Sequence, residues 1–302
     1  MKRIALLIAT NLAVVLLLSA VIQVFGIDHY LARRGLDYEA LIIFAAVFGF
    51  GGAFFSLAIS KWMAKTAMGV RVITQPASET ERWLVATVRS HAEKAGIGMP
   101  EVGVFESPSP NAFATGARKN AALVAVSTGL LRSMSRDQVE AVLGHEIAHV
   151  ANGDMVTLTL IQGVLNTFVF FLARVIGSLV DGLLRGNSSE QRGPGIGYFV
   201  IVMVSELVLA LFASMIVAWF SRRREFRADA GGAYLAGAGS MIGALQALKA
   251  AHSPSRMPQQ LQAFGINGGI AQGLQKLFMS HPPLDERIAA LEQRTDALGR
   301  AS

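Results

Sequence analysis

Long apolar stretches alternate with segments of mixed polarity along this chain of 302 residues. Two of the apolar stretches, Ile4–Phe25 and Ala40–Ile59, each run for about 20 residues, the length that a helix needs to cross a hydrocarbon core of ~30 Å. We therefore expect two transmembrane helices within residues 1–60. The first stretch follows two basic residues, as in a signal peptide, but it is too long for one and a second span follows it, so we expect an uncleaved anchor.

Two further apolar segments, Met155–Val180 and Ile196–Phe220, have the length of a span and carry one charge each, Arg174 and Glu206. We expect them to cross the membrane as a hairpin over residues 155–220. An unpaired charge inside a bilayer is costly, so we expect the two charges to form an ion pair that holds the hairpin together. The alternative is a buried hairpin that packs on the rest of the protein.

The remaining segments, 61–154 and 221–302, have the patterns of a soluble domain in two parts. Apolar residues spaced for one face predict a helix over Thr80–Ala95, and an apolar stripe with acidic residues in the first turn predicts another from Pro282 onward. Short apolar runs between turn-forming residues predict a small sheet. Its expected strands are Val102–Phe105, Ala112–Thr115 and Ala121–Val126.

The most informative polar pattern is H-E-x-x-H at residues 145–149. Residues four apart share a helix face, so two imidazoles at this spacing can hold one metal ion, with Glu146 beside them as a general base. The flanks predict the helix that the motif requires. Ser135 and Gln138 have the spacing of a capping box ahead of an apolar stripe, and Gly153 is a C-terminal stop.

A catalytic zinc site needs a third protein ligand and an open position for water. The chain contains no cysteine, so the ligand must be a histidine, an aspartate or a glutamate. The best candidate is Glu225, which shares a helix face with Asp229 at the i, i+4 spacing. One of these carboxylates can bind the metal while the other accepts a hydrogen bond from a ligating histidine.

These motifs resemble those of the membrane-bound zinc endopeptidases of the HtpX type, which are relatives of the CAAX prenyl proteases. The resemblance covers essentially the whole chain. H-E-x-x-H lies about eighty residues before the E-x-x-A-D motif at 225–229. Residues 111–116 resemble the family's strand over the active-site cleft, and residues 281–288 resemble its C-terminal H-P-P-x-x-x-R-I element.

The resemblance implies that His145, His149 and Glu225 bind one Zn²⁺ per chain and that Glu146 is the catalytic base. It implies a mostly α membrane protein, with about four transmembrane or membrane-associated helices and a cytosolic α+β catalytic domain of the zincin type with a small sheet. It also implies a role, the degradation of misfolded or damaged membrane proteins under stress in a bacterial inner membrane.

The strand that contains Asn111, Ala112, Phe113 and Ala114 is the candidate substrate-binding strand. A strand at the edge of the sheet can bind an extended peptide through main-chain hydrogen bonds. The alternative is an ordinary structural strand.

A donor is needed for the oxyanion of the reaction, and His281 and Arg287 are the residues to test first. The alternative for His281 is a local hydrogen bond at the start of a helix. His29, His91 and His252 have no partner at a metal-binding spacing, so we expect structural roles for them.

Composition and charge agree with a multi-pass membrane enzyme. Hydrophobic residues make up 52% of the chain and charged residues only 16%, which is typical of a protein with much of its length in lipid. Lysines and arginines concentrate on one side of the predicted spans, which places both termini and the catalytic residues in the cytoplasm. The three arginines at 222–224 directly follow a predicted span, where basic residues commonly meet anionic lipid, so we expect no nucleic-acid partner.

Two other classes of protein compete with a surface endopeptidase. In an intramembrane protease the motif helix would lie in the bilayer, but several polar and charged residues flank the motif within a turn or two, and burying them in lipid costs several kcal/mol. A non-catalytic scaffold that uses zinc only to fold would not require Glu146.

Overall fold

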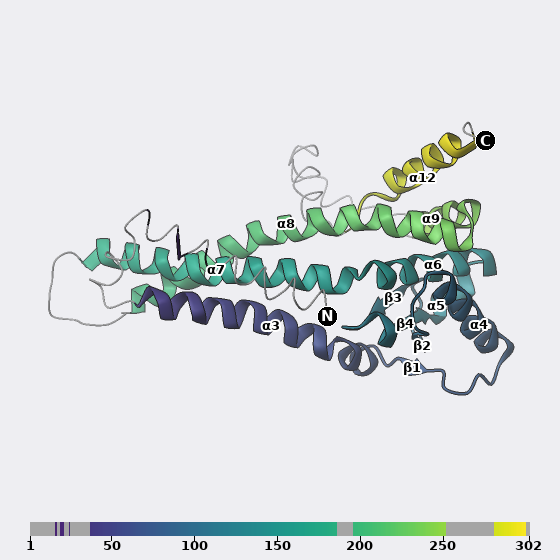
Figure 1. Cartoon of the computed structure of the whole chain (residues 1–302), viewed down its shortest axis with the longest axis horizontal. Helices are drawn as coiled ribbons and strands as arrows, with labels where there is room; N and C mark the ends of the chain where they lie inside the picture. The colour runs from purple at the N-terminus through teal and green to yellow at the C-terminus, as the bar shows by residue number, and fades with distance from the viewer. Residues whose placement is uncertain are drawn as a thin grey trace, which may run out of the picture. The chain divides into compact units, whose positions relative to one another are not determined.

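The structure is a computed structural model that describes residues 37–185, 196–251 and 281–299, together with four isolated positions before residue 25. The predicted first span, Ile4–Phe25, lies almost entirely outside the described residues. The described part is mostly helical and contains a four-stranded sheet and three helices long and apolar enough to cross a membrane, which confirms the expected fold class (Figure 1).

The chain divides into two compact units. One combines Met1–Ser56 with Leu158–Val217, and the other combines Leu57–Thr157 with Ala218–Ser302. Both units are therefore built from segments that are distant in sequence.

Three long helices contain the apolar segments that the sequence predicts as spans within the described residues. They are α3 (Tyr38–Ala67), α7 (Asp154–Arg185) and α8 (Ile196–Ala236). Helix α8 has 41 residues and is about 60 Å long at 1.5 Å per residue, twice the thickness of the hydrocarbon core. Its last turns therefore extend beyond a span.

Small residues let the helices of the first unit pack closely. A Cβ atom added at Gly49 of α3 would lie 2.5 Å from Thr167 Oγ1 of α7, so only glycine permits this contact. Helices α7 and α8 are linked by the predicted ion pair, which is confirmed: Arg174 Nη1 lies 2.8 Å from Glu206 Oε1. The Arg174 guanidinium also lies 5.5 Å from the ring centroid of Phe44, a cation–π contact.

The sheet of the second unit has the strand order β1-β2-β4-β3. Its strands are β1 (Arg71–Val72), β2 (Glu101–Phe105), β3 (Ala112–Thr115) and β4 (Leu123–Ser127). Strands β2 and β4 are parallel, and β3 returns antiparallel to β4 at the edge of the sheet. The predicted strand Ala121–Val126 begins two residues later than expected, because a 3₁₀ turn, η1 (Lys119–Ala121), precedes it.

Helices cover one face of this sheet. Those in contact with the strands are α4 (Glu79–Lys94), α5 (Thr128–Ser133) and α6 (Arg136–Asn152), while α9 (Ala238–Ala251) packs on α6 and α12 (Leu284–Gly299) packs on α9. The predicted helix Thr80–Ala95 starts one residue early because Ser78 is its N-cap and accepts a hydrogen bond from the Glu81 N–H.

The main core lies between the sheet and these helices. Alternate residues of β4, Val124 and Val126, point into it and pack with Leu143 and Ile147 of α6. Leu291 of α12 closes the same core, which confirms the apolar stripe predicted for the C-terminal helix. The core therefore fixes α6, the helix of the H-E-x-x-H motif, against the sheet.

Candidate metal centre

Helix α6 begins and ends as the sequence predicts. The Ser135 side chain accepts a hydrogen bond from the Gln138 N–H, and the Gln138 side chain accepts one from the Ser135 N–H, so the capping box is complete. Gly153 ends the helix in the left-handed conformation with φ of 69°, which glycine adopts without strain. Both motif histidines, His145 and His149, are buried on this helix.

Helix α8 reaches α6 through a contact between glycines. A Cβ atom added at Gly144 of α6 would lie 3.3 Å from Gly232 Cα of α8, and one added at Gly231 would lie 2.5 Å from Ala148 Cβ. Side chains at these positions would hold the helices apart. Because Gly231 and Gly232 follow Glu225 by less than two turns, this close approach places the Glu225 carboxylate beside the motif histidines.

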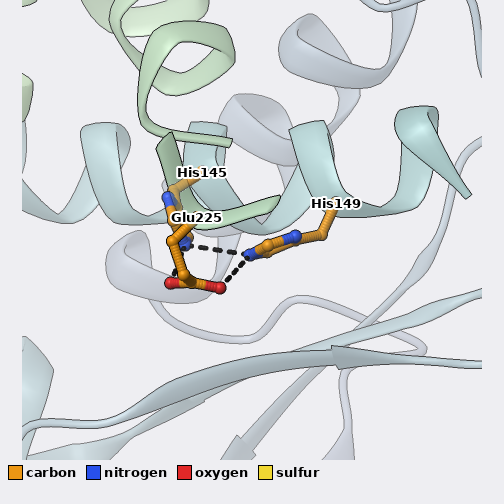
Figure 2. Close-up of side chains that lie close together, drawn as sticks. All are labelled: His145, His149 and Glu225. Atoms are coloured by element: carbon orange, nitrogen blue, oxygen red, sulfur yellow. Dashed lines mark hydrogen bonds and ion pairs between the residues drawn. The ribbon is translucent and has the colours of Figure 1, made fainter. Parts of the chain in front are cut away.

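One donor atom from each of His145, His149 and Glu225 lies within 4.8 Å of the other two. Figure 2 shows the three side chains pointing toward one another, two from α6 and one from α8. The two Nε2 atoms are 3.1 Å apart, His149 Nε2 is 3.2 Å from Glu225 Oε1, and His145 Nε2 is 3.6 Å from Glu225 Oε2.

Each histidine has a further carboxylate at its other ring nitrogen. His149 Nδ1 hydrogen-bonds to Asp154 Oδ2 at 2.7 Å. His145 Nδ1 lies 3.0 Å from Asp229 Oδ1, but its N–H is not aimed at that oxygen, so the pair is a charge contact without a hydrogen bond. With Nδ1 beside a carboxylate, Nε2 is the nitrogen of each ring that faces Glu225 and could bind a metal ion.

Arg287 and His281 complete the surroundings of the two carboxylates. Arg287 binds Asp229 with two hydrogen bonds of 2.8 and 2.5 Å and lies 3.3 Å from Glu225 Oε2. Arg287 is buried, so its charge is balanced by the Asp229 and Glu225 carboxylates. His281 Nδ1 lies 2.8 Å from Glu225 Oε2, while 59% of the His281 side chain is exposed.

The surroundings of the histidines favour positive charge in the centre. Burial lowers the pKa of His145, but Asp229 and Glu225 outweigh this effect and raise it to about 9. Burial also lowers the pKa of His149, and Asp154 with Glu225 raises it above its ordinary value. A metal ion must therefore displace a proton to bind here, so metal binding should release protons near neutral pH.

The donor set fits a zinc ion. Two imidazole nitrogens and one carboxylate are the ligands of one class of catalytic zinc site, and bond lengths of 2.0–2.2 Å in a tetrahedron separate ligand atoms by ~3.3 Å. The Nε2 atoms are 3.1 Å apart and His149 Nε2 is 3.2 Å from Glu225 Oε1, both close to that value, while the other carboxylate oxygen, Oε2, lies 3.6 Å from His145 Nε2. In addition, Glu225 Oε1 is fully buried and accepts no hydrogen bond. Buried oxygens normally have a partner, and a bound cation would supply one here.

The other predicted site residues lie around this cluster. Glu146 is half-buried on α6, and its charge acts on His145, His149 and Arg287. Strand β3, which includes Ala112–Ala114, packs against α6, and Asn111 precedes it. Their catalytic and substrate-binding roles stay predictions.

His91 has a structural environment. Its Nε2 contacts the Glu140 carbonyl at 3.0 Å, its ring is buried, and it does not belong to the cluster of three ligand candidates.

Sequence reasoning missed two features of the centre. Asp154 was not singled out, although its position directly after the Gly153 stop places it within reach of the last turn of α6. The pair Gly231-Gly232 was also missed, and two glycines inside a helical pattern are a signal for close packing that could have revealed it.

Comparisons with known proteins identify the family of this chain. The model of Peptidase family M48 matches residues 78–295. Protease HtpX of Thioalkalivibrio sulfidiphilus is 63% identical over 294 residues, which cover 97% of this chain and 99% of that protein. Protease HtpX homolog of Thiobacillus denitrificans is 62% identical over 291 residues, with coverages of 96% and 99%.

Among solved structures, S. mikatae Ste24p has a similar fold. The TM-score is 0.61 at 20% sequence identity, and the likeness covers 95% of this chain and 67% of that chain. These matches confirm the resemblance that the motifs indicate. The chain belongs to peptidase family M48 and is a metalloprotease.

Proposed function

We propose that this membrane metalloprotease is a zinc-dependent endopeptidase that cuts misfolded or damaged membrane proteins at the cytoplasmic face of a bacterial inner membrane. The observation that carries the proposal is the buried cluster of His145, His149 and Glu225, whose three donor atoms converge from two helices. Glu146 lies next to this cluster without belonging to it, as a catalytic base requires.

The proposed chemistry is hydrolysis of a peptide bond by water. A zinc ion held by the three ligands would lower the pKa of its bound water toward ~7 and polarise the scissile carbonyl. Glu146 accepts the proton of the attacking water and returns it to the leaving amine. His281 is the proposed donor to the oxyanion, because its side chain is largely exposed while it remains beside Glu225. Arg287 is less suited, since it is buried and bound to Asp229.

Strand β3 is the proposed binding site for an extended peptide. Its inner partner is β4, and the Ser127 N–H donates to the Asn111 carbonyl at 2.8 Å. Main-chain groups alternate in direction along an antiparallel strand, so the N–H and C=O groups of Ala112 and Ala114 point away from β4, toward the edge. A substrate strand can pair with these groups and lie across α6, with little demand on its own side chains.

The substrate class and the location follow from the attachment to spans. Glu225 lies on the same continuous helix as the predicted span Ile196–Phe220, five residues beyond its end, or roughly 8 Å along the axis. A site tethered in this way meets other proteins of the same membrane at a raised effective concentration. The excess of lysine and arginine on this side of the spans supports a cytoplasmic position.

The change Glu146→Gln tests the proposal. Purified Glu146→Gln protein should retain zinc at one ion per chain, measured by elemental analysis, and should lose cleavage of an unfolded membrane-protein substrate. Glu93→Gln, the same change at an exposed residue of α4, is the control and should cleave as the wild type does. Equal cleavage by wild type and Glu146→Gln would overturn the catalytic assignment, and a wild type that takes up no zinc would overturn the metal assignment.

A further inference from the structure

Asp154 is a buried carboxylate that the proposed reaction does not use. It is 3% exposed, and its Oδ2 atom accepts a hydrogen bond of 2.7 Å from His149 Nδ1. It is the first residue of α7 and follows Gly153, whose left-handed conformation turns the chain from α6 into α7. Burying a charge is unfavourable unless it is paired, so its pairing with a ligand candidate calls for an explanation.

We propose that Asp154 is the positioning residue of His149. The proposal rests on the metal site described above. By accepting the Nδ1 proton, Asp154 selects the imidazole form whose Nε2 lone pair is free, and it fixes the rotation of the ring so that this lone pair faces Glu225. It also raises the basicity of the ring as a ligand.

Asp229 lies beside the other histidine, His145, but it is also bound by an arginine. Arg287 binds both of its oxygens, so much of the Asp229 charge is already neutralised, and the His145 N–H is not aimed at it. The His149–Asp154 contact is shorter, at 2.7 Å against 3.0 Å, and has hydrogen-bond geometry. We therefore expect Asp154 to orient its histidine more strongly than Asp229 does.

The position of Asp154 gives the contact a second consequence. The residue belongs to the first turn of α7, while His149 belongs to the last turn of α6, and Gly153 is the single residue between the two helices. The orientation of a metal ligand therefore depends on how α7 leaves α6. Within residues 145–154, helix α6 therefore supplies two of the ligands and the first residue of α7 supplies the carboxylate that orients one of them.

Zinc affinity of the full chain tests the proposal without an activity measurement. All proteins carry Glu146→Gln to prevent self-digestion, are stripped with a chelator in detergent, and are titrated with Zn²⁺ against a chromophoric chelator. Asp154→Ala should weaken zinc binding about 10–100-fold, the usual effect of removing such a partner. Cobalt in place of zinc should give a visible spectrum with altered bands in Asp154→Ala, because the His149 ring is no longer held.

Asp137→Ala is the matched control, because Asp137 is an exposed aspartate in the first turn of α6 and contributes the same favourable charge to a helix start. It should bind zinc within about twofold of the parent. Asp154→Asn keeps the shape but can present an N–H to Nδ1 and select the wrong form of the ring, so it should weaken zinc binding too.

Unchanged zinc affinity and an unchanged cobalt spectrum in Asp154→Ala would overturn the positioning role. Loss of the folded state in both Asp154 variants, seen by circular dichroism of the metal-free proteins while Asp137→Ala folds, would also overturn it in favour of a structural role. Failure of the parent protein to bind zinc would instead refute the metal site itself.

Discussion

The glycine contact between α6 and α8 predicts that one added methyl group will disrupt the metal centre from a distance. In Gly231→Ala, the new Cβ would lie 2.5 Å from Ala148 Cβ, whereas carbon atoms in contact are normally 3.5–4.0 Å apart. The two helices must therefore separate or slide by about 1 Å. Glu225 lies on the same rigid helix and moves with it, while metal–ligand distances tolerate only about 0.2 Å of change.

The energetic effect of this substitution has two parts. Overpacking costs typically ~1–3 kcal/mol, and replacing a helical glycine by alanine returns ~0.5–1 kcal/mol, so we expect a net destabilisation of about 0–2.5 kcal/mol. Zinc affinity should fall at least about tenfold, because a displacement of this size exceeds what the coordination geometry tolerates.

The control is Gly239→Ala in α9, where nothing lies within 4 Å of the added Cβ. It should leave zinc affinity unchanged and keep or raise stability by up to ~1 kcal/mol. Zinc titration and thermal unfolding of the two variants in detergent measure both effects. Wild-type zinc affinity in Gly231→Ala would refute the reasoning that close helix packing sets the position of Glu225.

Three further predictions concern the membrane hairpin, the substrate strand and the orientation. Replacing Arg174 by Met or Glu206 by Leu should each destabilise the protein more than the double replacement does, because each single change leaves one charge unpaired. A double-mutant cycle should give a coupling free energy of ~0.5–3 kcal/mol, and additive effects would exclude a stabilising pair. Ala114→Pro removes a main-chain donor from the free edge of β3 and should lower kcat/KM for a peptide about tenfold, whereas Ala114→Ser, which keeps the N–H, should not; equal values would exclude pairing at this edge. Because the chain has no cysteine, single cysteines report the orientation: an impermeant maleimide should label Ser188→Cys in spheroplasts and Ser90→Cys only after lysis, and the reverse would place the catalytic unit outside.

The sequence predicts the local elements well because their signals are local. Ser135, Gln138 and Gly153 define both ends of α6, and each acts within one turn of the residue that carries it. The strand Ala112–Thr115 and the start of the C-terminal helix follow in the same way from short apolar runs and turn residues. Even the Arg174–Glu206 pair can be predicted, because an unpaired charge in a membrane span is energetically costly and each of these two apolar segments offers one charge.

The contacts around the metal centre are harder to predict because they join elements distant in sequence. Arg287 was a candidate for the oxyanion donor, but the fold buries it against Asp229, 58 residues away. Nothing in the pattern around Arg287 indicates this pairing, which depends on how α12 packs. Asp154 was missed for the opposite reason: it is near in sequence, but its role appears only once the left-handed turn at Gly153 brings its carboxylate to the His149 ring.

The metal content of purified protein, wild type beside Glu225→Ala, tests the central claim most directly. The account predicts one zinc ion per chain in the wild type and loss of that ion in Glu225→Ala, because two imidazoles alone leave the site one ligand short of a catalytic zinc centre. Full retention of zinc in Glu225→Ala would contradict the account and would direct attention to Asp229 or His281 as the third ligand.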